Sequence, residues 1–257
     1  MKKLSFFLLS LLAVTLFTSC NKEDETVSKQ SYSSTINCRA IDGDNVVFSQ
    51  NTAKVELNYT DMTIQFTVDY RDASGAVHNM TTPAMKMIQK AGMTYSFNHA
   101  GGTQQAGSLE GYINLSSGLM WYTLTNGDQQ IVSTTHLLYS FVPTTVTNPD
   151  NGYSYNHQQS EYLFAPDAKG ETCVMSISNF IPNIAGTVEV SKIEYRGLKL
   201  TPTASGYVIT ASEVEPTNIH SNYVITDLNI TLDGQCRLID GTFKCKDLEF
   251  KIAGNLF

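Results

Sequence analysis

Hydrophobic and polar residues alternate along most of the chain with a period of two, the pattern of a strand that buries one face. The clearest run is 62–70, in which Ile64, Phe66 and Val68 alternate with Thr, Gln and Asp residues. Similar runs follow toward the C-terminus, among them 224–232 and 248–252. The chain is therefore predicted to be all-β and to fold as an antiparallel β-barrel or β-sandwich.

Segment 82–92 fits two different periods. Thr82-Pro83 at its start and Gly92 at its end would cap a short helix with one apolar stripe. Met85 and Met87 on one face would instead suit a strand. We favour the strand, because the neighbouring segments are strands and the whole chain is rich in Thr, Val, Ile and Tyr.

Residues 143–161 are rich in Thr, Asn, Pro, Ser and Gln and poor in aliphatic residues. Such a composition is typical of a linker or a long loop. We therefore expect two β domains in tandem, an N-terminal domain over 35–147 and a C-terminal domain over 148–257. A single large domain is the alternative, because the length permits either.

The first twenty residues have the order of an export signal. Two lysines precede an apolar run, 4–17, which is too short to span a bilayer as a mature helix. Thr18 and Ser19 then precede Cys20. This arrangement resembles the lipobox of bacterial lipoproteins. The resemblance implies a signal peptide over 1–19 and an acylated Cys20 that holds the protein at a lipid bilayer.

An acidic and polar stretch, 20–34, follows and is expected to form a tether. Its run Lys22-Glu23-Asp24-Glu25 resembles the export signal of surface lipoproteins in Bacteroidetes-type bacteria. The resemblance implies a position at the bacterial outer membrane, exposed at the cell surface. A periplasm-facing position is the alternative.

The charge of the chain limits its partners. It has 17 basic and 24 acidic residues, a formal net charge of −7. Removal of residues 1–19 takes away Lys2 and Lys3, which leaves 15 basic residues and a net charge of −9. Nucleic acids attract basic patches, so nucleic acid is not an expected partner.

Four cysteines follow Cys20, and an even number in an exported protein favours disulfides. Asp240-Gly241 predicts a two-residue hairpin turn, which would place Cys236 opposite Cys245. That pair would be non-hydrogen-bonded, with Cα atoms roughly 4.5 Å apart, a spacing that suits a disulfide. Cys38 and Cys173 would then be left to pair. The alternative is reduced cysteines that pack as small apolar residues.

Motifs of catalysis and of cofactor binding are not found in the sequence. The five histidines are scattered, without acids or cysteines at ligand spacing, so we predict no metal site and no cofactor. The run 42–45, Asp-Gly-Asp-Asn, has the oxygen density of a calcium loop but lacks its later ligands, so a plain turn is the better interpretation. Methionines at 80, 85, 87 and 93 could form a patch for a soft or apolar ligand, although methionines more often fill gaps in a core.

Loop 151–159 is the strongest candidate for a binding site. Tyr153, Tyr155 and His157 lie there among amide side chains. Rings offer flat apolar faces and amides offer hydrogen-bond donors and acceptors, as sugar or peptide binding requires. A solvated linker is the alternative. Trp121 is a further ligand-binding candidate, although its apolar strand favours a core position.

Four stretches of the second half resemble lipocalin-like (calycin-like) β-barrel lipoproteins of Bacteroidetes: Ser178-Asn179-Phe180, 188–200, Gly206-Tyr207 and Leu248-Glu249-Phe250. The resemblance implies antiparallel barrels. With the export signal, it leads us to expect a membrane-anchored, non-enzymatic envelope protein that binds a glycan, a small ligand or another protein. A structural or accessory assembly component of the envelope is the alternative, and an enzyme is the third possibility.

Overall fold

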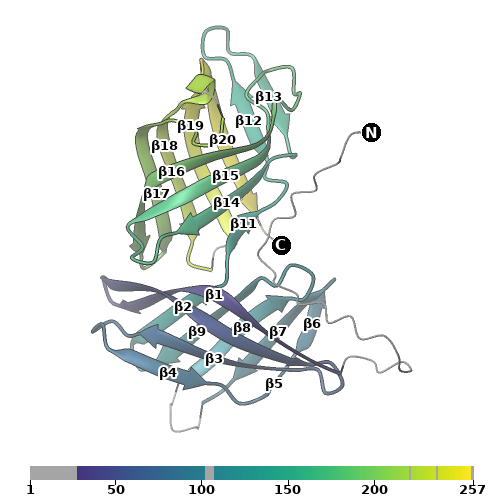
Figure 1. Ribbon diagram of the computed structural model, residues 1–257, viewed down its shortest axis with the longest axis vertical. Coiled ribbons are helices and arrows are strands. Elements are labelled where there is room, and N and C mark those ends of the chain that lie inside the picture. The colour runs from purple at the N-terminus through teal and green to yellow at the C-terminus, as the bar shows by residue number, and fades with distance from the viewer. Residues whose placement is uncertain (1–27, 102–106, 220, 236, 256–257) are drawn as a thin grey trace.

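The structure, a computed structural model, describes residues 28–101, 107–219, 221–235 and 237–255. These residues form two antiparallel sheets that follow one another along the sequence, so the expected all-β fold of two domains is confirmed. We call 28–134 the first domain and 137–255 the second domain. Figure 1 shows the first domain below the second.

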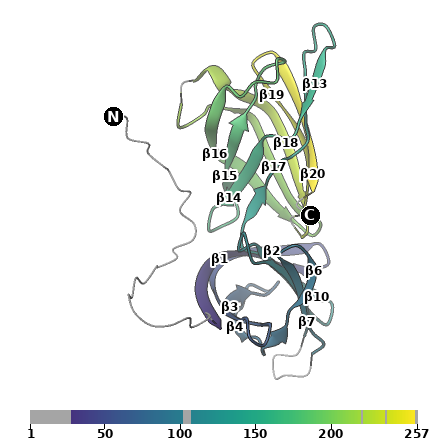
Figure 2. The same ribbon diagram turned by 90° about the vertical axis from the view of Figure 1, so that its right-hand side faces the viewer.

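The first domain is a sheet of ten strands that follows the order β4-β3-β2-β1-β10-β9-β8-β7-β6, with β5 paired to β3. The strands are β1 (Lys29–Asp42), β2 (Asn45–Asn58), β3 (Thr63–Arg71), β4 (Val77–Thr81), β5 (Met85–Lys86), β6 (Ile88–Ala91), β7 (Thr94–His99), β8 (Ser108–Asn114), β9 (Met120–Asn126) and β10 (Gln129–Thr134). The sheet curls until β5 comes beside β7. In Figure 2 this domain forms a nearly complete ring.

The alternating pattern places the core of this domain as expected. In β3, Ile64, Phe66 and Val68 are buried, and they pair with Leu57, Val55 and Ala53 of β2. Segment 82–92 holds the short strands β5 and β6, so the strand interpretation is confirmed. Asp42 pairs with Asn45 across a two-residue turn, which is a plain hairpin connection.

The second domain is a sheet of ten strands in the order β11-β14-β15-β16-β17-β18-β19-β20-β12-β13. The strands are β11 (Leu137–Tyr139), β12 (Thr144–Thr147), β13 (Ser154–His157), β14 (Glu161–Pro166), β15 (Thr172–Phe180), β16 (Val190–Thr203), β17 (Gly206–Val214), β18 (Ile225–Asp233), β19 (Leu238–Cys245) and β20 (Leu248–Asn255). A short 3-10 helix, η1 (Ser221–Tyr223), precedes β18.

One bent segment closes this second sheet into a barrel. β11 pairs with β14 at one end of the strand order, and β12, which follows β11 directly along the chain, pairs with β20 at the other end. Between them the Val142 N–H donates to the Ser160 carbonyl at 3.1 Å, and the Ala253 N–H donates to the Pro143 carbonyl at 3.1 Å. Counted as one strand, β11/β12 makes an eight-stranded barrel with β14 to β20, a size whose interior side chains can fill.

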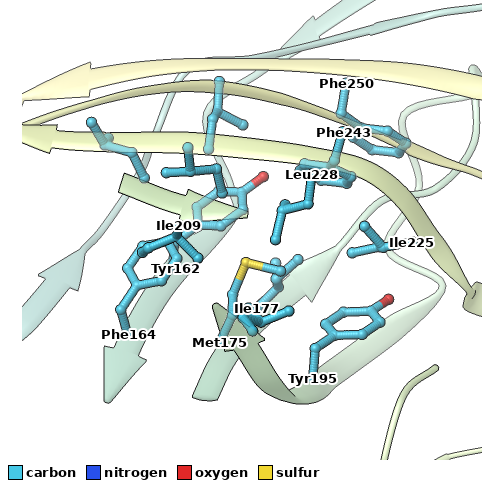
Figure 3. Packing of buried hydrophobic residues seen from close by; sticks show 14 of the residues in the cluster. Tyr162, Phe164, Met175, Ile177, Tyr195, Ile209, Ile225, Leu228, Phe243 and Phe250 are labelled. Atoms are coloured by element: carbon cyan, nitrogen blue, oxygen red, sulfur yellow. The ribbon is translucent and has the colours of Figure 1, made fainter. Parts of the chain in front are cut away.

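Large aromatic residues fill the barrel of the second domain. Figure 3 shows Phe243, Phe250, Tyr162 and Tyr195 converging with aliphatic residues from several strands. The rings of Phe243 and Phe250 stack with centroids 4.6 Å apart. The buried cluster includes eight aromatic residues and one methionine, against three aromatic residues and four methionines in the first domain. The second core therefore has more rigid shapes to pack, and the first has more adaptable ones.

The division between the domains falls earlier than the boundary expected at 147/148. The first sheet ends at Thr134 and the second begins at Leu137. Segment 143–161, expected to be a linker, instead holds β12, β13 and the start of β14. Its polar composition belongs to a hairpin that leaves the barrel, as described below, and polar residues suit such a hairpin as well as they suit a linker.

The described cysteines, Cys38, Cys173 and Cys245, form no disulfide. Asp240-Gly241 does not turn but lies inside β19, where Gly241 pairs with Ile230 and Ile252. A Cβ on Gly241 would lie 2.5 Å from the Asn229 carbonyl oxygen, so this glycine serves a close approach of two strands. Without that hairpin, the pairing argument for Cys236 and Cys245 fails.

Three of the four cysteines that follow Cys20 lie within the described residues, and all three are reduced. Cys38, Cys173 and Cys245 are buried and have free thiols, while Cys236 lies outside the described residues. Burial raises the pKa of the Cys38 thiol to about 11 and that of Cys173 to about 12. These cysteines behave as small apolar core residues, the alternative left open by the sequence.

A buried arginine fastens the two domains together. Arg39, in β1, is 1% exposed, and its guanidinium reaches into the second domain. It donates to the carbonyls of Thr203 and Gly234 at 2.5 Å and of Gly206 at 3.3 Å, and it lies 4.9 Å over the Tyr207 ring. These carbonyl oxygens take the place of the water molecules that would solvate the Arg39 guanidinium at an exposed position.

Phe48 adds an apolar contact beside this arginine. Its ring meets the Tyr207 ring edge-on at 6.4 Å, and a Cβ on Gly170 would lie 2.4 Å from it. Gln50 donates to the Pro166 carbonyl at 3.2 Å. The part of the β1–β2 hairpin that holds Arg39, Phe48 and Gln50 therefore packs against the second domain and links the two sheets.

Candidate binding surface

The β12–β13 hairpin extends past the end of the second barrel. Thr144 to Thr147 pair with His157 to Ser154, and β12 continues the barrel by pairing with β20. Figure 2 shows the hairpin standing clear of the other connections at that end. A rigid barrel that carries a protruding hairpin is a common way to present a binding surface.

The turn of this hairpin is held by its own side chains. Asn148 donates its N–H to the Tyr153 carbonyl at 2.9 Å, and its carbonyl accepts from Gly152 N–H at 2.9 Å. The Asn148 side chain accepts from Asp150 N–H, and the Asn151 side chain accepts from Tyr153 N–H, both at 2.9 Å. These local bonds replace long-range packing and order the loop before any partner binds.

Burial of the three predicted residues increases from the turn toward the barrel. Tyr153, just after the turn, is 58% exposed; Tyr155 in β13 is half-buried; His157, at the base, is 6% exposed. The Tyr155 and His157 rings stack with centroids 6.0 Å apart. A Cβ on Gly186 would lie 2.3 Å from the Tyr155 ring, so the β15–β16 loop packs against it.

His157 is an anchor of the hairpin. Burial lowers its pKa, so the ring is neutral at pH 7. Its Nδ1 accepts from the Gln159 N–H at 3.5 Å, and Gln158 and Gln159 beside it are exposed. The face available to a partner is therefore Tyr153 with the outer edge of Tyr155 and nearby amides.

Trp121 is not part of this surface. It lies in β9, is 2% exposed, and stacks on Tyr112 with ring centroids 5.0 Å apart. From the second domain, the guanidinium of Arg237 lies 5.7 Å over its ring. Trp121 thus has the buried position that its apolar strand favoured, at the junction of the two domains, and ligand binding by it stays a prediction.

Phe141 is an exposed aromatic residue that the sequence did not single out. It is 67% exposed and has φ +55, a backbone angle rarely adopted by residues with a side chain. It lies between β11 and β12, where the chain bends to close the barrel. The sequence offered no signal for it, because a run of apolar residues from 137 to 142 looks like one continuous strand.

Asp72, Ser74 and His78 converge in the first domain. Ser74 Oγ donates to Asp72 Oδ1 at 2.6 Å, and His78 Nε2 lies 2.8 Å from Asp72 Oδ2. Those hydrogen bonds hold the pKa of the Asp72 carboxyl below its usual range. The serine bonds to the acid and not to the imidazole, so the nucleophile–base contact of serine catalysis is not made. The cluster stabilises the exposed turn before β4.

In the described ranges, no three His, Cys, Asp or Glu side chains are placed to hold a metal ion together. The helices within these ranges include none with the length and apolar character needed to cross a membrane. Cys20 and the rest of the predicted signal and lipidation region lie outside the described residues.

Comparisons with known proteins give little guidance. No protein-family model and no curated protein matches the chain. Among solved structures, it is similar to the isotype 1 transferrin binding protein B of serogroup B Neisseria meningitidis. The match covers 89% of this chain and 75% of that one, at 7% identity and a TM-score of 0.25. A likeness at that score carries no argument about function, and the lipocalin-like resemblance stays a prediction.

Proposed function

We propose that this chain is a non-enzymatic envelope lipoprotein, anchored at the outer membrane through acylated Cys20, that binds a glycan or a protein through the β12–β13 hairpin. The observation that carries the proposal is the hairpin itself. It protrudes from a closed barrel, its turn is ordered by Asn148 and Asn151, and its tip presents Tyr153.

The packing of the second barrel supports a surface site over an internal one. Lipocalin-type barrels that hold a small ligand need space inside. Here Tyr162, Met175, Tyr195 and Phe243 occupy the interior and are at most 1% exposed. Binding is then left to the loops at the barrel ends, and the tyrosines of the hairpin offer apolar area with little side-chain entropy to lose.

A glycan array probed with the full chain carrying Cys20→Ala tests the site. We expect Tyr153→Ala to weaken binding to any captured glycan at least about tenfold, the effect of losing about 1.4 kcal/mol. Phe141→Ala is the matched control, because it removes an equally exposed aromatic ring outside the hairpin. Equal binding by Tyr153→Ala and the parent chain would reject the hairpin as the site.

The anchor is tested separately by fractionation of cells. Cys20→Ala should move the protein from the membrane fraction to the soluble one, because the acyl chains supply the apolar area that holds it. Protease added to intact cells should digest the wild-type protein if it faces outward. Persistent membrane association of the variant would contradict lipid anchoring.

A second candidate function, an assembly component of the envelope, is favoured by the edge of β13. Among the described strands, β13 pairs with β12 alone, which leaves one edge open to strand addition. Asn156→Pro would remove an edge donor at an exposed position. If β13 joins copies or partners, this variant should lose assembly in sedimentation while its circular dichroism is unchanged. Assembly that survives the substitution would exclude this edge.

A further inference from the structure

A small cavity lies in the first domain where the curled sheet meets itself. Its volume is about 20 Å³, enough for one water molecule or one bare ion. Met80 of β4, Met85 of β5 and His99 of β7 all line it, so it brings together residues far apart along the sheet order. Two of the methionines that the sequence marked as a possible soft-ligand patch therefore meet a histidine.

The histidine has a ring nitrogen with nothing to bind. His99 Nε2 is buried and has no hydrogen-bond partner in the part of the chain that the structure describes. Met80 and Met85 are 6% and 3% exposed, so their thioethers are screened from bulk water. A buried imidazole nitrogen without a partner is costly unless something else occupies the site.

The hydroxyl groups around the cavity are already engaged. Thr82 Oγ1 accepts from the Phe66 N–H at 3.0 Å, and Thr81 Oγ1 bonds to Thr67 Oγ1 at 3.0 Å. Among the described lining side chains, this leaves one imidazole nitrogen and two thioether sulfurs for an occupant. A buried water needs two to four polar partners, and thioethers are weak acceptors, so these side chains bind water poorly.

We propose that Met80, Met85 and His99 form a binding site for a soft monovalent cation, namely Cu(I). Thioether and imidazole ligands suit Cu(I), and neutral ligands suit a single positive charge. The cavity lining includes no carboxylate or thiolate to offset the second charge of a divalent ion. The site is independent of the hairpin proposed above to bind a partner.

Silver ion tests the proposal directly, because Ag⁺ has the same ligand preference and undergoes no redox change. The full chain should carry Cys20→Ser and Cys236→Ser, so that the remaining thiols are the buried ones, and its methionine methyl groups should be ¹³C-labelled. We expect one Ag⁺ to bind per chain and to shift the methyl signals of Met80 and Met85. Anaerobic competition with a Cu(I) chelator should then show Cu(I) binding, and Zn²⁺ should not bind.

The double variant Met80→Leu/Met85→Leu keeps side-chain volume, so the fold should survive while Ag⁺ affinity falls at least about tenfold. Met93→Leu is the matched control, because Met93 is 49% exposed and does not line the cavity. His99→Gln should weaken binding without moving the Met93 signal. The proposal is overturned if the double variant binds Ag⁺ as tightly as the parent, if only Met93 shifts, or if binding disappears on replacing Cys38, Cys173 or Cys245.

Discussion

The two domains solve the same problem of a curled antiparallel sheet in different ways. The second closes through the bent segment β11/β12, which pairs with β14 and then with β20. The first closes through the shorter segment β5/β6, in which β5 pairs with β3 and β6 pairs with β7. Met87 joins these two strands, and its N–H donates to the Met62 carbonyl at 2.8 Å. Backbone pairing therefore crosses both closures, but β5 is only 2 residues long, so the seam of the first domain, where β3, β5, β6 and β7 meet, has the shorter ladder.

The cores follow this difference. Rings such as Phe243 and Phe250 fill the second barrel, while methionines such as Met85 and Met87 lie at the seam of the first domain. Long unbranched methionine side chains suit an irregular gap, because they adapt their rotamers to it. The cavity at His99 lies at the same seam.

The largest expected effect comes from the start of β17. Gly206 has φ +153, and a Cβ there would lie 1.9 Å from the Leu232 carbonyl oxygen. Gly206→Ala should cost the second barrel more than about 3 kcal/mol in the free energy of unfolding, because backbone must move on both strands. Urea unfolding followed by circular dichroism measures it.

Gly92→Ala is the control for that substitution in the first domain. Gly92 also has a positive φ, +52, but no atom lies within 4 Å of its Cβ position. It should cost about 1–2 kcal/mol, the penalty of the backbone angle alone. Equal losses in the two variants would show that the close strand approach at Gly206 is not what matters.

Removal of the arginine between the domains comes next. Arg39→Met should lower stability by about 3 kcal/mol, because the second-domain carbonyls of Thr203, Ala204, Gly206 and Gly234 lose a charged donor. The calorimetric transition should split in two as the domains uncouple. The single tryptophan, Trp121, lies at the same junction, so its fluorescence should change at the earlier transition.

Arg71→Met is the matched control, since that guanidinium donates to Gly75 at an exposed turn within one domain. It should leave a single transition at nearly the wild-type temperature. If Arg39→Met also melts in one step, the junction is held by Phe48 and the chain connection without the arginine.

The contrast between the two cores can be measured with one substitution in each. Phe243→Leu should destabilise the second domain by about 2 kcal/mol, since about three carbons leave a tightly stacked pair. Met120→Leu in the first domain conserves volume and should cost less than about 1.5 kcal/mol. A larger loss of stability for Met120→Leu than for Phe243→Leu in urea unfolding would mean that the core of the first domain tolerates substitution less well than that of the second.

The smallest expected effect concerns the connection between the domains. Burial lowers the pKa of His136 from 6.5 to about 4, so between these values the unfolded chain binds a proton that the folded chain does not. Stability should therefore fall as pH drops from 6.5 toward 4, by about 1 kcal/mol at pH 5.5. His136→Gln should remove that part of the pH dependence, measured by urea unfolding at several pH values.

Local patterns predicted the strands well and their partners poorly. Ile64, Phe66 and Val68 alternate and are buried, because side-chain alternation in a strand depends only on neighbouring residues. Asp240-Gly241 has the composition of a turn, yet the strand β18 approaches so closely that a glycine is needed within a strand. A dipeptide cannot distinguish these two uses of glycine.

The residues of the candidate site also differ in how far the sequence predicted their positions. Tyr153 is exposed and lies in the loop that composition indicated, since turns rich in Asn and Gly stay at the surface. Trp121 was placed by contacts with Arg237, which is 116 residues away along the chain. Closure by β11/β12, the carbonyl cage of Arg39 and the meeting of Met80, Met85 and His99 likewise join distant segments.

By itself the sequence determined the all-β class, the alternation that buries each strand, and the polar, exposed character of the segment that carries Tyr153. These depend on the period of the backbone and on turn chemistry, which act over a few residues. Only the tertiary structure decided how each sheet closes, that Cys38, Cys173 and Cys245 stay reduced, and that Trp121 is covered. Each of these depends on which strands become neighbours, and that is settled by packing the whole chain.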